Sequence, residues 1–517
     1  MRIAVPRERS ASTVEWFVSM VTSLVAVFSV IASIYYYSMT FCPPVTVMTG
    51  LACVLKADAM APRAEMWLII AGVFGLAGAL SYPMKRLGGA SFTRARLFKP
   101  SSLEGEATGW KARLFVPLLL AGYAALQLTE ILFVPGGNKP YSDPQAFYIP
   151  AALDILSGTK CSPSPYSSTC NYEHPPLDKL FLALSIKVFG QNFTGYSIFP
   201  LLFGAGSLLL TYGIALEVSG QKVARYAAIF LLIDGTFLGI NDQAWTDVPM
   251  VFFGLFGVYV LLKVRNKRQL TWAAISGALL GLSILSKETG VLFVVAAIAC
   301  ALWLTRNITV KRLVVLLGVT ALVAAGGLQI YDMLLTPFPT FIAHIQYILH
   351  YNSLIGLPGW PQESWLPFLG KSVVPLAWLI FYPPFGFIST MPEEWLLLAS
   401  LPAVLYLIGW KSSSLSELER RTILFIPLWL ASTYAFYFFA QLFRSTYPFY
   451  MIQMLPAAVI ADGWMMTKFT RPMKILFILG CLGWLYVFFP MSSTAIPVLT
   501  YVSKWISCVG SACPGGI

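Results

Sequence analysis

Residues 173–179 bring four ionisable side chains close together: Glu173, His174, Asp178 and Lys179. A pair of prolines between them opens a predicted amphipathic helix. Side chains of these types transfer protons and bind anionic groups such as phosphate. The alternative is a solvated helix end in which the charges only pair with one another.

Asp143 lies upstream, at the start of another predicted amphipathic helix. From residue 145 onward the apolar side chains recur at helical spacing, namely Phe147, Tyr148, Ala152, Ile155 and Leu156. An Asp followed by Pro also makes a good helix start, with Asp143 as the N-cap and Pro144 at the first helical position. Asp143 is therefore either a chemical group or only a cap.

Three further segments carry charge at the ends of apolar runs: Asp242 with Asp247, Lys287 with Glu288, and Arg444 with Tyr447. Each has a structural alternative. Asp247 caps the helix that follows it, Lys287 pairs with Glu288, and Arg444 is an interfacial cation whose charged end reaches water. Asp234 lies inside an apolar run, where a carboxylate is costly unless it is paired.

The composition indicates a membrane protein. Of 517 residues, 57% are hydrophobic and 11% are charged, whereas soluble chains average about 45–50% apolar and about 25% charged residues. A soluble enzyme of this size needs far more charge to cover its surface. The composition therefore excludes a soluble multidomain protein, a disordered chain and a fibre. The net charge of +12 is typical of basic cytoplasmic loops, so nucleic acid is not an expected partner.

The apolar segments predict an all-α polytopic membrane protein with about 13 transmembrane helices, since a span needs about 20 mostly apolar residues. The candidate spans are 14–38, 66–83, 114–134, 197–217, 223–240, 249–265, 271–286, 289–305, 313–331, 393–410, 422–440, 447–467 and 475–490. The segment 373–390 is apolar but contains three prolines, and we interpret it as an outer-face or re-entrant piece.

The basic residues predict the orientation of these spans in the cell membrane. With the N-terminus inside, 25 of the 35 Lys and Arg residues fall in inner segments, in keeping with the positive-inside rule. An odd number of spans then places the C-terminus outside. The ionisable residues described above, apart from Asp234, and all three histidines lie on the outer face in this topology.

The chain divides into six predicted parts. They are a two-helix membrane appendage (1–84), a basic cytoplasmic linker (85–113), a membrane module (114–331) with the outer loop 135–196, a second long outer loop (332–392), the C-terminal spans (393–490) and an outer tail (491–517). The first apolar stretch is too long for a signal peptide and lacks a small-residue cleavage site, so we expect an anchor. Both long loops are rich in aromatics and proline, and we expect them to pack on the membrane surface.

Six of the eight cysteines form three close pairs on the outer side: Cys42–Cys53, Cys161–Cys170 and Cys508–Cys513. Pairs on the oxidising side of a membrane predict disulfides. Close pairs also bind metal ions, but no second pair and no histidine lies near enough in sequence to favour that. The remaining two, Cys300 and Cys481, fall inside spans and are expected to be core thiols.

The order of these motifs resembles the protein O-mannosyltransferases and their bacterial relatives, including the lipid A aminoarabinose transferase, which are GT-C glycosyltransferases. The resemblance rests on the acidic start of the first outer loop, its amphipathic helix, the His-Pro-Pro-Leu-x-Lys sequence at 174–179, and segments 224–228, 242–252, 285–289 and 444–456. It covers about 114–490. It implies a GT-C-like bundle with an 11-span core, two extra N-terminal spans and amphipathic helices on the outer face.

The chain departs from the family in three places. The family usually has Asp-Glu at its first acidic site, where this chain has Asp143 and Pro144. Eukaryotic members often have an Arg before the next span, and residues 196–200 contain none. The second long loop has no inserted β-trefoil domain. Any role of the second carboxylate is therefore lost or moved, and acceptor recognition does not follow the eukaryotic form.

The resemblance implies a sugar donor on a polyprenyl (dolichyl-type) phosphate and a hydroxyl acceptor on a protein or a lipid. The acceptor attacks the anomeric carbon with inversion, which needs a carboxylate base and a cation for the departing phosphate. Asp143 is the predicted base, and Asp247 orients the acceptor or helps a metal. The predicted substrate-binding residues are Glu173, His174, Lys179, Lys287, Arg444 and Tyr447. A divalent metal ion as cofactor remains an alternative, although no spacing of ligand residues supports one.

Two other classes of protein remain as alternatives. A transporter or flippase of a polar or lipid-linked solute places ionisable residues at mid-membrane and often shows inverted repeats. Here the acids gather at one outer face and no half-repeat is visible. A catalytically inactive scaffold is favoured only by the Asp-Pro departure and the missing Arg.

Overall fold

The structure is a computed structural model that describes residues 110–133, 147–161, 170–241, 243–263, 269–305, 309–354, 416–440, 446, 448–475 and 477–479. No β-strand occurs among these residues, and nearly all of them are helical, so the all-α prediction is confirmed for this part of the chain. The predicted parts 1–84 and 491–517 lie outside it. The chain forms two compact units, and the helices of the site belong to the unit of Leu103–Thr467 and Phe488–Ser492.

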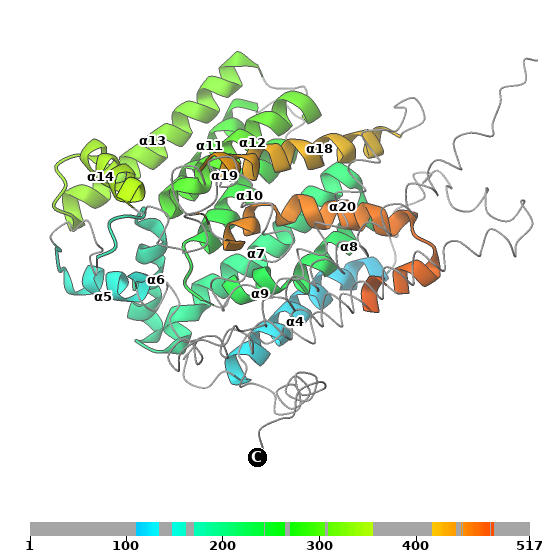
Figure 1. Cartoon of the computed structure of the whole chain (residues 1–517), viewed down its shortest axis with the longest axis horizontal. Helices are drawn as coiled ribbons and strands as arrows, with labels where there is room; N and C mark the ends of the chain where they lie inside the picture. Colours follow the sequence, from blue (N-terminus) through cyan, green and yellow to red (C-terminus); the bar gives the residue numbers. More distant parts are fainter. Residues whose placement is uncertain are drawn as a thin grey trace, which may run out of the picture. The chain divides into compact units, whose positions relative to one another are not determined.

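Figure 1 labels the described helices, which are coloured in the order of the chain. The helices are α4 (Trp110–Phe133), α5 (Ile149–Ser157), α6 (Leu177–Phe189), α7 (Phe193–Ser219), α8 (Gln221–Leu232), α9 (Gly235–Asn241), α10 (Asp247–Lys263), α11 (Gln269–Ser286), α12 (Val291–Cys300), α13 (Val310–Leu335), α14 (Phe341–Leu354), α18 (Glu417–Thr433), α19 (Ala435–Ala440) and α20 (Leu455–Lys468). Three shorter helical segments are η3 (Glu288–Gly290), η4 (Ala301–Thr305) and η6 (Pro448–Gln453).

Three of the described helical stretches are long and apolar enough to cross a membrane: Thr194–Ser219, Val310–Leu335 and Leu418–Ala440. Shorter apolar helices occur at Leu114–Gln127, Leu270–Ser286 and Glu288–Cys300. These helices coincide with predicted spans. The total of about 13 includes segments outside the described residues and stays a prediction.

Asp234 explains why the predicted span 223–240 is broken. The helix α8 ends at Leu232, α9 begins at Gly235, and the Oδ1 of Asp234 accepts a hydrogen bond of 2.8 Å from the N–H of Phe237. The carboxylate that is costly inside a span thus caps the start of α9. The predicted span 422–440 likewise divides into α18 and α19.

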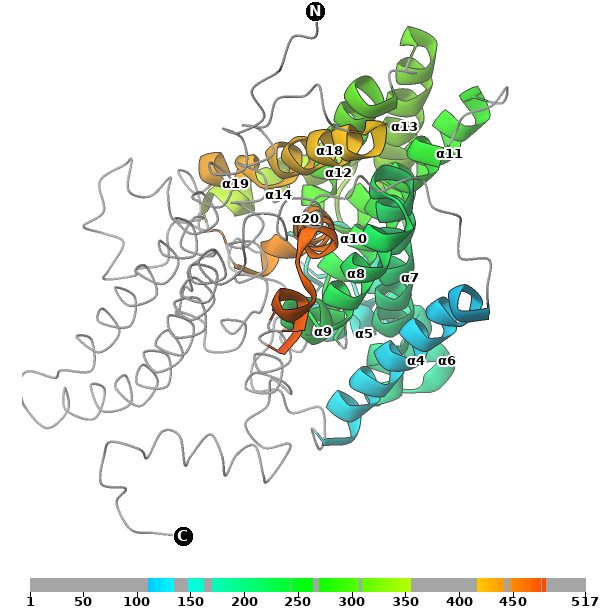
Figure 2. The same cartoon turned by 90° about the vertical axis from the view of Figure 1, so that its right-hand side faces the viewer.

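The central helices approach one another closely through small and hydroxyl residues. Ser276 donates from Oγ to the carbonyl of Gly257 at 2.8 Å, and Thr320 donates from Oγ1 to the carbonyl of Gly277 at 3.1 Å. A Cβ on Gly277 would lie 2.5 Å from the carbonyl oxygen of Leu316. Helix interfaces of this kind are typical of membrane bundles. Figure 2 shows α10 beside α7, and α11 beside α13, which are among the packed pairs.

One face of α13 exposes large apolar side chains along its length. Val310, Val314, Leu322 and Met333 are 78%, 63%, 70% and 71% exposed. Such a continuous apolar face is unfavourable in water and is the expected surface of a helix that contacts lipid. The protein is an integral membrane protein.

The two segments predicted as long outer loops, 135–196 and 332–392, contain short helices that pack beside the central ones. The helix α5 packs against α6, α6 reaches α11, and α14 packs against α13. Figure 1 shows α5, α6 and α14 together on the left, at one end of α13. An apolar cluster of Leu285, Leu328 and Tyr331 receives Ile155 of α5 and Leu177 of α6. These short helices therefore rest on the ends of the central helices, which is where the predicted site residues that the structure describes lie.

Candidate functional site

A buried ion pair joins two of the predicted site residues. Asp247 opens α10, and Lys287 lies in extended conformation between α11 and η3. The Nζ of Lys287 donates to the Oδ2 of Asp247 at 2.7 Å, and the two side chains are 3% and 0% exposed. A buried ion pair of this kind persists only with close geometry, because both charges have left water.

Aromatic side chains from late in the sequence complete the surroundings of Lys287. Its Nζ lies 4.6 Å from the centre of the Tyr450 ring in η6, a cation–π contact. Tyr450 stacks on Tyr437 of α19 with ring centres 5.2 Å apart. Gln453 donates from Nε2 to the Oγ1 of Thr289 at 3.1 Å, which ties η6 to the lysine-bearing turn. The pair is thus enclosed by segments that lie far apart in the chain.

A second, partly exposed pair contains Glu288, the residue that directly follows Lys287. The Nδ1 of His174 is 3.2 Å from the Oε2 of Glu288, and the two side chains are 20% and 27% exposed. Tyr148, just before α5, meets the His174 ring edge-on with ring centres 5.9 Å apart. His174 and Glu288 form an accessible edge of the cluster that contains Asp247 and Lys287.

The start of α6 adds two buried ionisable groups. Asp178 and Lys179 are 4% and 0% exposed. Burial raises the pKa of Asp178 to about 8, and the nearby Lys179 partly opposes that shift. Burial lowers the pKa of Lys179 to about 8, against the opposing fields of Glu173 and Asp178. The fields of Asp247 and Lys287 also reach the carboxyl of Asp178. Asp178 therefore belongs to the same cluster as the ion pair.

Lys179 binds the main chain of the preceding loop. Its Nζ donates to the carbonyl oxygen of Asn171 and, at 2.8 Å, to that of His174. Asn171 has a φ of 48° and donates from Nδ2 to the Oε1 of Glu173 at 3.0 Å. Asn is one of the few residues that adopt this left-handed conformation readily. Two of the three N–H groups of Lys179 thus hold residues 171–174 in a tight turn.

Three buried carboxyl oxygens of the cluster have no hydrogen-bond partner among the described residues: Oε2 of Glu173, Oδ2 of Asp178 and Oδ1 of Asp247. Buried polar atoms are normally paired. Unpaired acceptors in one cluster are suited to receive hydrogen bonds from the hydroxyl groups of a ligand. Asp247 in particular presents one oxygen to Lys287 and keeps the other for a further donor.

The structure brings together five of the predicted site residues: Asp247, Glu173, His174, Lys179 and Lys287. The other three, Asp143, Arg444 and Tyr447, lie outside the described residues. The alternative role of Asp143 as a helix cap also falls outside the described residues. The described part of this helix, α5, begins at Ile149 and has Pro150 in its first turn.

Three further residues of the cluster had no predicted role in binding or catalysis: Asp178, Glu288 and Tyr450. All three stand in the motifs from which the resemblance was drawn. Asp178 and Tyr450 differ from ordinary surface residues in being buried. The sequence shows only that Asp178 lies in an interfacial helix and Tyr450 in an aromatic-rich segment, and neither pattern reveals burial. Glu288 follows Lys287 directly, so the sequence suggests a local pair, whereas the structure places Glu288 on His174, 114 residues away.

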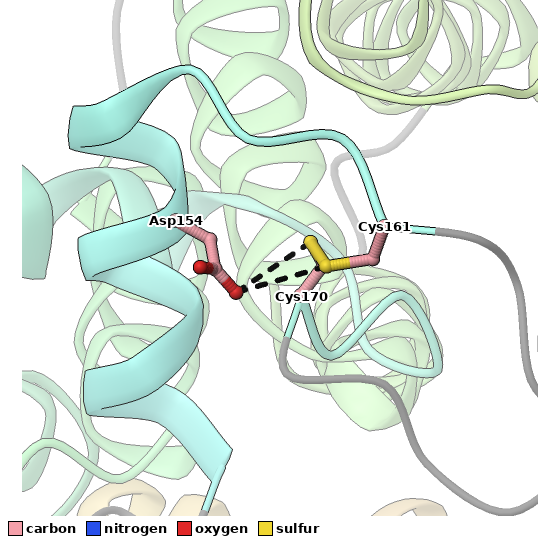
Figure 3. Close-up of side chains that lie close together, drawn as sticks. All are labelled: Asp154, Cys161 and Cys170. Atoms are coloured by element: carbon pink, nitrogen blue, oxygen red, sulfur yellow. Dashed lines mark hydrogen bonds between the residues drawn. A yellow bond between two sulfur atoms is a disulfide. The ribbon is translucent and has the colours of Figure 1, made fainter.

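The predicted disulfide Cys161–Cys170 is confirmed, with Cα atoms 5.9 Å apart. Figure 3 shows the carboxylate of Asp154 against it, with Oδ2 3.7 Å and 3.6 Å from the two sulfur atoms. Among the described residues this trio is the one group of Cys, His, Asp and Glu side chains close enough to hold a metal ion. The sulfur–sulfur bond uses both thiols, so the trio does not match a metal site. The pairs Cys42–Cys53 and Cys508–Cys513 lie outside the described residues.

Residues 173–327 match a family model described as dolichyl-phosphate-mannose-protein mannosyltransferase. The predicted resemblance is confirmed. The matched region contains most of the described cluster, namely Glu173, His174, Asp178, Lys179, Asp247, Lys287 and Glu288. The site motifs and the family model therefore agree on similarity to the protein mannosyltransferases.

Relatives in sequence cover part of the chain. A polyprenol-phosphate-mannose–protein mannosyltransferase of Corynebacterium glutamicum is 27% identical over 224 residues, which are 36% of this chain and 42% of that protein. An uncharacterised protein of Aquifex aeolicus is 26% identical over 155 residues, which are 29% of this chain and 31% of that protein. The chain thus spans less than half the length of these curated relatives.

A solved structure shares the fold over a longer stretch. The crystal structure of ArnT from Cupriavidus metallidurans, bound to undecaprenyl phosphate, superposes with a TM-score of 0.50 at 14% identity. The match covers 78% of this chain and 70% of ArnT. At this identity the comparison establishes a common fold.

Proposed function

We propose that the protein transfers a sugar from a polyprenyl-phosphate donor to a hydroxyl acceptor at the outer face of the membrane, with inversion at the anomeric carbon. The observation that carries the proposal is the buried Asp247–Lys287 pair beside the partly exposed His174–Glu288 pair. Both pairs lie in the region that matches the mannosyltransferase model. Carboxylates and cations are thereby gathered at helix ends, and the partly exposed His174 and Glu288 are proposed to be where a lipid-linked sugar phosphate approaches them.

The cations are proposed to bind the phosphate. As the bond between the anomeric carbon and the phosphate oxygen breaks, negative charge grows on the polyprenyl phosphate, and a fixed cation stabilises it. Lys287 has three N–H groups, so it can hold Asp247 and a phosphate oxygen together. When His174 is protonated, its Nδ1–H is held by Glu288 and its Nε2–H can meet the same phosphate. Arg444 and Tyr447, which precede η6, are proposed to contact the donor too.

Lys179 has a more limited part in this scheme. Its ammonium group is fully buried and binds two carbonyl groups of the turn 171–174. We propose that it holds the turn first, and that contact with phosphate requires one of those bonds to open. Glu173, whose Oε2 is unpartnered among the described residues, is proposed to accept from a hydroxyl of the sugar.

A carboxylate must take the proton of the acceptor. The acceptor oxygen forms its bond to the anomeric carbon, the bond to phosphate breaks, the hydroxyl proton passes to the base, and polyprenyl phosphate leaves. We propose Asp143 as the base, because it opens the same outer loop as His174. Asp247, with Oδ1 unpartnered among the described residues, is proposed to orient the acceptor hydroxyl.

The proposed topology places this site outside. The chain would cross the membrane about 13 times, with 1–84 as an appendage, 85–113 as a cytoplasmic linker, 114–331 as the catalytic module, 332–392 as an outer loop, 393–490 as the last spans and 491–517 as an outer tail. The acceptor is proposed to be a protein Ser or Thr, or a glycolipid.

Binding of the lipid phosphate tests the proposal. Purified protein in detergent is titrated with undecaprenyl or dolichyl phosphate, and its melting temperature is followed. A saturating rise is expected, because a ligand that binds only the folded state stabilises it. Lys287→Met should abolish the rise, whereas the control Lys187→Met, at an exposed lysine of α6, should keep it. A rise of equal size in both variants would remove Lys287 from the phosphate site.

A further inference from the structure

His344, unlike the partly exposed His174, is buried, and it is fixed by two short hydrogen bonds. Its Nδ1 lies 2.7 Å from the Oδ1 of Asp332, and its Nε2 lies 2.7 Å from the carbonyl oxygen of Tyr172. His344 and Asp332 are both 0% exposed in their side chains. Phe338 stacks on the imidazole with ring centres 4.4 Å apart. His344 therefore has no access to a substrate.

The partners of His344 determine the direction of its hydrogen bonds. A main-chain carbonyl only accepts, so Nε2 must carry a proton and donate to Tyr172. An ionised Asp332 also only accepts, so Nδ1 donates to it as well. Thr336 donates from Oγ1 to the same Oδ1 at 3.1 Å. The result is a chain of hydrogen bonds from the end of α13, through the imidazole on α14, to the main chain of residue 172.

Tyr172 is the residue directly before Glu173 and His174. Its hydroxyl donates to the carbonyl of Leu335 at the end of α13, at 3.4 Å, and its ring meets Phe338 edge-on. On the other side of the same turn, Lys179 holds the carbonyl groups of Asn171 and His174. The turn that carries the accessible histidine of the site is thus held from two sides, by α6 and by α13 and α14.

We propose that His344 is a positioning residue: through its hydrogen bond to the carbonyl of Tyr172, and with Asp332 as its support, it fixes the place of His174 in the site. This proposal rests on the proposed function for its effect on catalysis. It also gives the second long outer loop a role, because α14 lies in that loop and reaches the site through Tyr172.

The hydrogen-bond directions make the proposal testable by exchange of both partners. In His344→Gln, the new side chain has one amide group that donates and one oxygen that accepts, so it cannot donate to Tyr172 and to an ionised Asp332 together. In the double variant H344Q/D332N, the Asn amide donates to the Gln oxygen and the Gln amide donates to Tyr172, which restores the chain. Asp332→Asn alone leaves a neutral His344 that still donates from Nε2.

The expected activities follow from these connections. A misplacement of about 1 Å lowers a rate about 10²-fold, so we expect a loss of kcat of this order in His344→Gln, a small loss in Asp332→Asn, and recovery in the double variant. In a His174→Ala background, His344→Gln should lower kcat about threefold further or less, because coupled residues are not additive. Failure of the double variant to recover, or full additivity with His174→Ala, would overturn the proposal.

A second measurement needs no enzymatic activity. Diethyl pyrocarbonate modifies accessible imidazoles, and peptide mass spectrometry separates the three histidines. In the wild type we expect modification of His350, which is exposed, slower modification of His174 and none of His344. His174 should react faster in His344→Gln and return to the wild-type rate in H344Q/D332N. An unchanged rate for His174 in His344→Gln would contradict the proposal even if the protein proves not to be a glycosyltransferase.

Discussion

Lys287→Met, compared with a double variant, separates the contribution of the buried ion pair to stability from its contribution to catalysis. The substitution removes the ammonium group and leaves the carboxylate of Asp247, which is fully buried, without its 2.7 Å partner. Removal of one member of a buried pair typically destabilises a protein by about 3–5 kcal/mol, because the remaining charge has neither water nor a counter-ion. We therefore expect a clear fall in melting temperature for this variant.

The double variant D247N/K287M removes both charges and should regain most of that stability. Neutral side chains of similar volume in place of a buried ion pair are often neutral or stabilising. Its activity should nevertheless stay low. If Lys287 stabilises the departing phosphate, its loss lowers kcat by about 10²–10³-fold, as for the removal of one fixed charge-stabilising group.

Thermal unfolding in detergent and sugar transfer are measured on the same preparations of wild type, Lys287→Met, D247N/K287M and the surface control Lys187→Met. We expect low stability and low activity for Lys287→Met, and recovered stability with low activity for D247N/K287M. Near-normal transfer by the double variant would refute the chemical role of both residues and leave the pair as a structural element.

Four other outcomes are expected. Asp143→Asn should lower transfer by about 10²–10⁴-fold with an unchanged melting temperature, since Asn caps a helix about as well as Asp; near-normal transfer would move the base to Asp247. Burial raises the pKa of Asp178 to about 8, so between about pH 4 and 8 the unfolded chain loses a proton that the folded chain keeps, and stability falls as pH rises; thermal unfolding of Asp178→Asn should show a shallower fall, and an identical pH slope would contradict this. Peptide mapping without reduction should find Cys508–Cys513 and Cys42–Cys53 linked, and free thiols there would refute both pairs. Labelling of introduced cysteines should place residues near 143 outside and residues near 85 inside, and labelling from one side would overturn the topology.

The sequence predicts the helical bundle well because apolar segments must form helices in lipid, whatever their tertiary contacts. The break between the predicted spans 271–286 and 289–305 is confirmed at Lys287, as is the disulfide Cys161–Cys170. What composition does not reveal is where a helix breaks. Asp234 interrupts a predicted span because its carboxylate caps α9, and that depends on a hydrogen bond formed three residues later.

The partners inside the site could not be predicted in the same way. Lys287 and Asp247 are 40 residues apart, and the sequence alone gives no reason to join them. The sequence predicts that Lys179 is a cation beside the membrane, yet its ammonium group is buried and donates to two carbonyl groups. His344 and Asp332 fall in the predicted outer loop 332–392, and their link to the site runs through the carbonyl of Tyr172, 172 residues from the histidine. Pairing across helices is set by packing, which a single sequence does not encode locally.

The most direct measurement of the central claim follows both products of sugar transfer. Wild-type protein in detergent is mixed with a labelled polyprenyl-phosphate sugar and a peptide or glycolipid with a free hydroxyl group, and mass spectrometry records the acceptor and the lipid. We expect one polyprenyl phosphate released for each sugar gained by the acceptor, an inverted anomeric configuration, and loss of both signals in D247N/K287M. Binding of the lipid without any transferred sugar, across donors and acceptors, would contradict it.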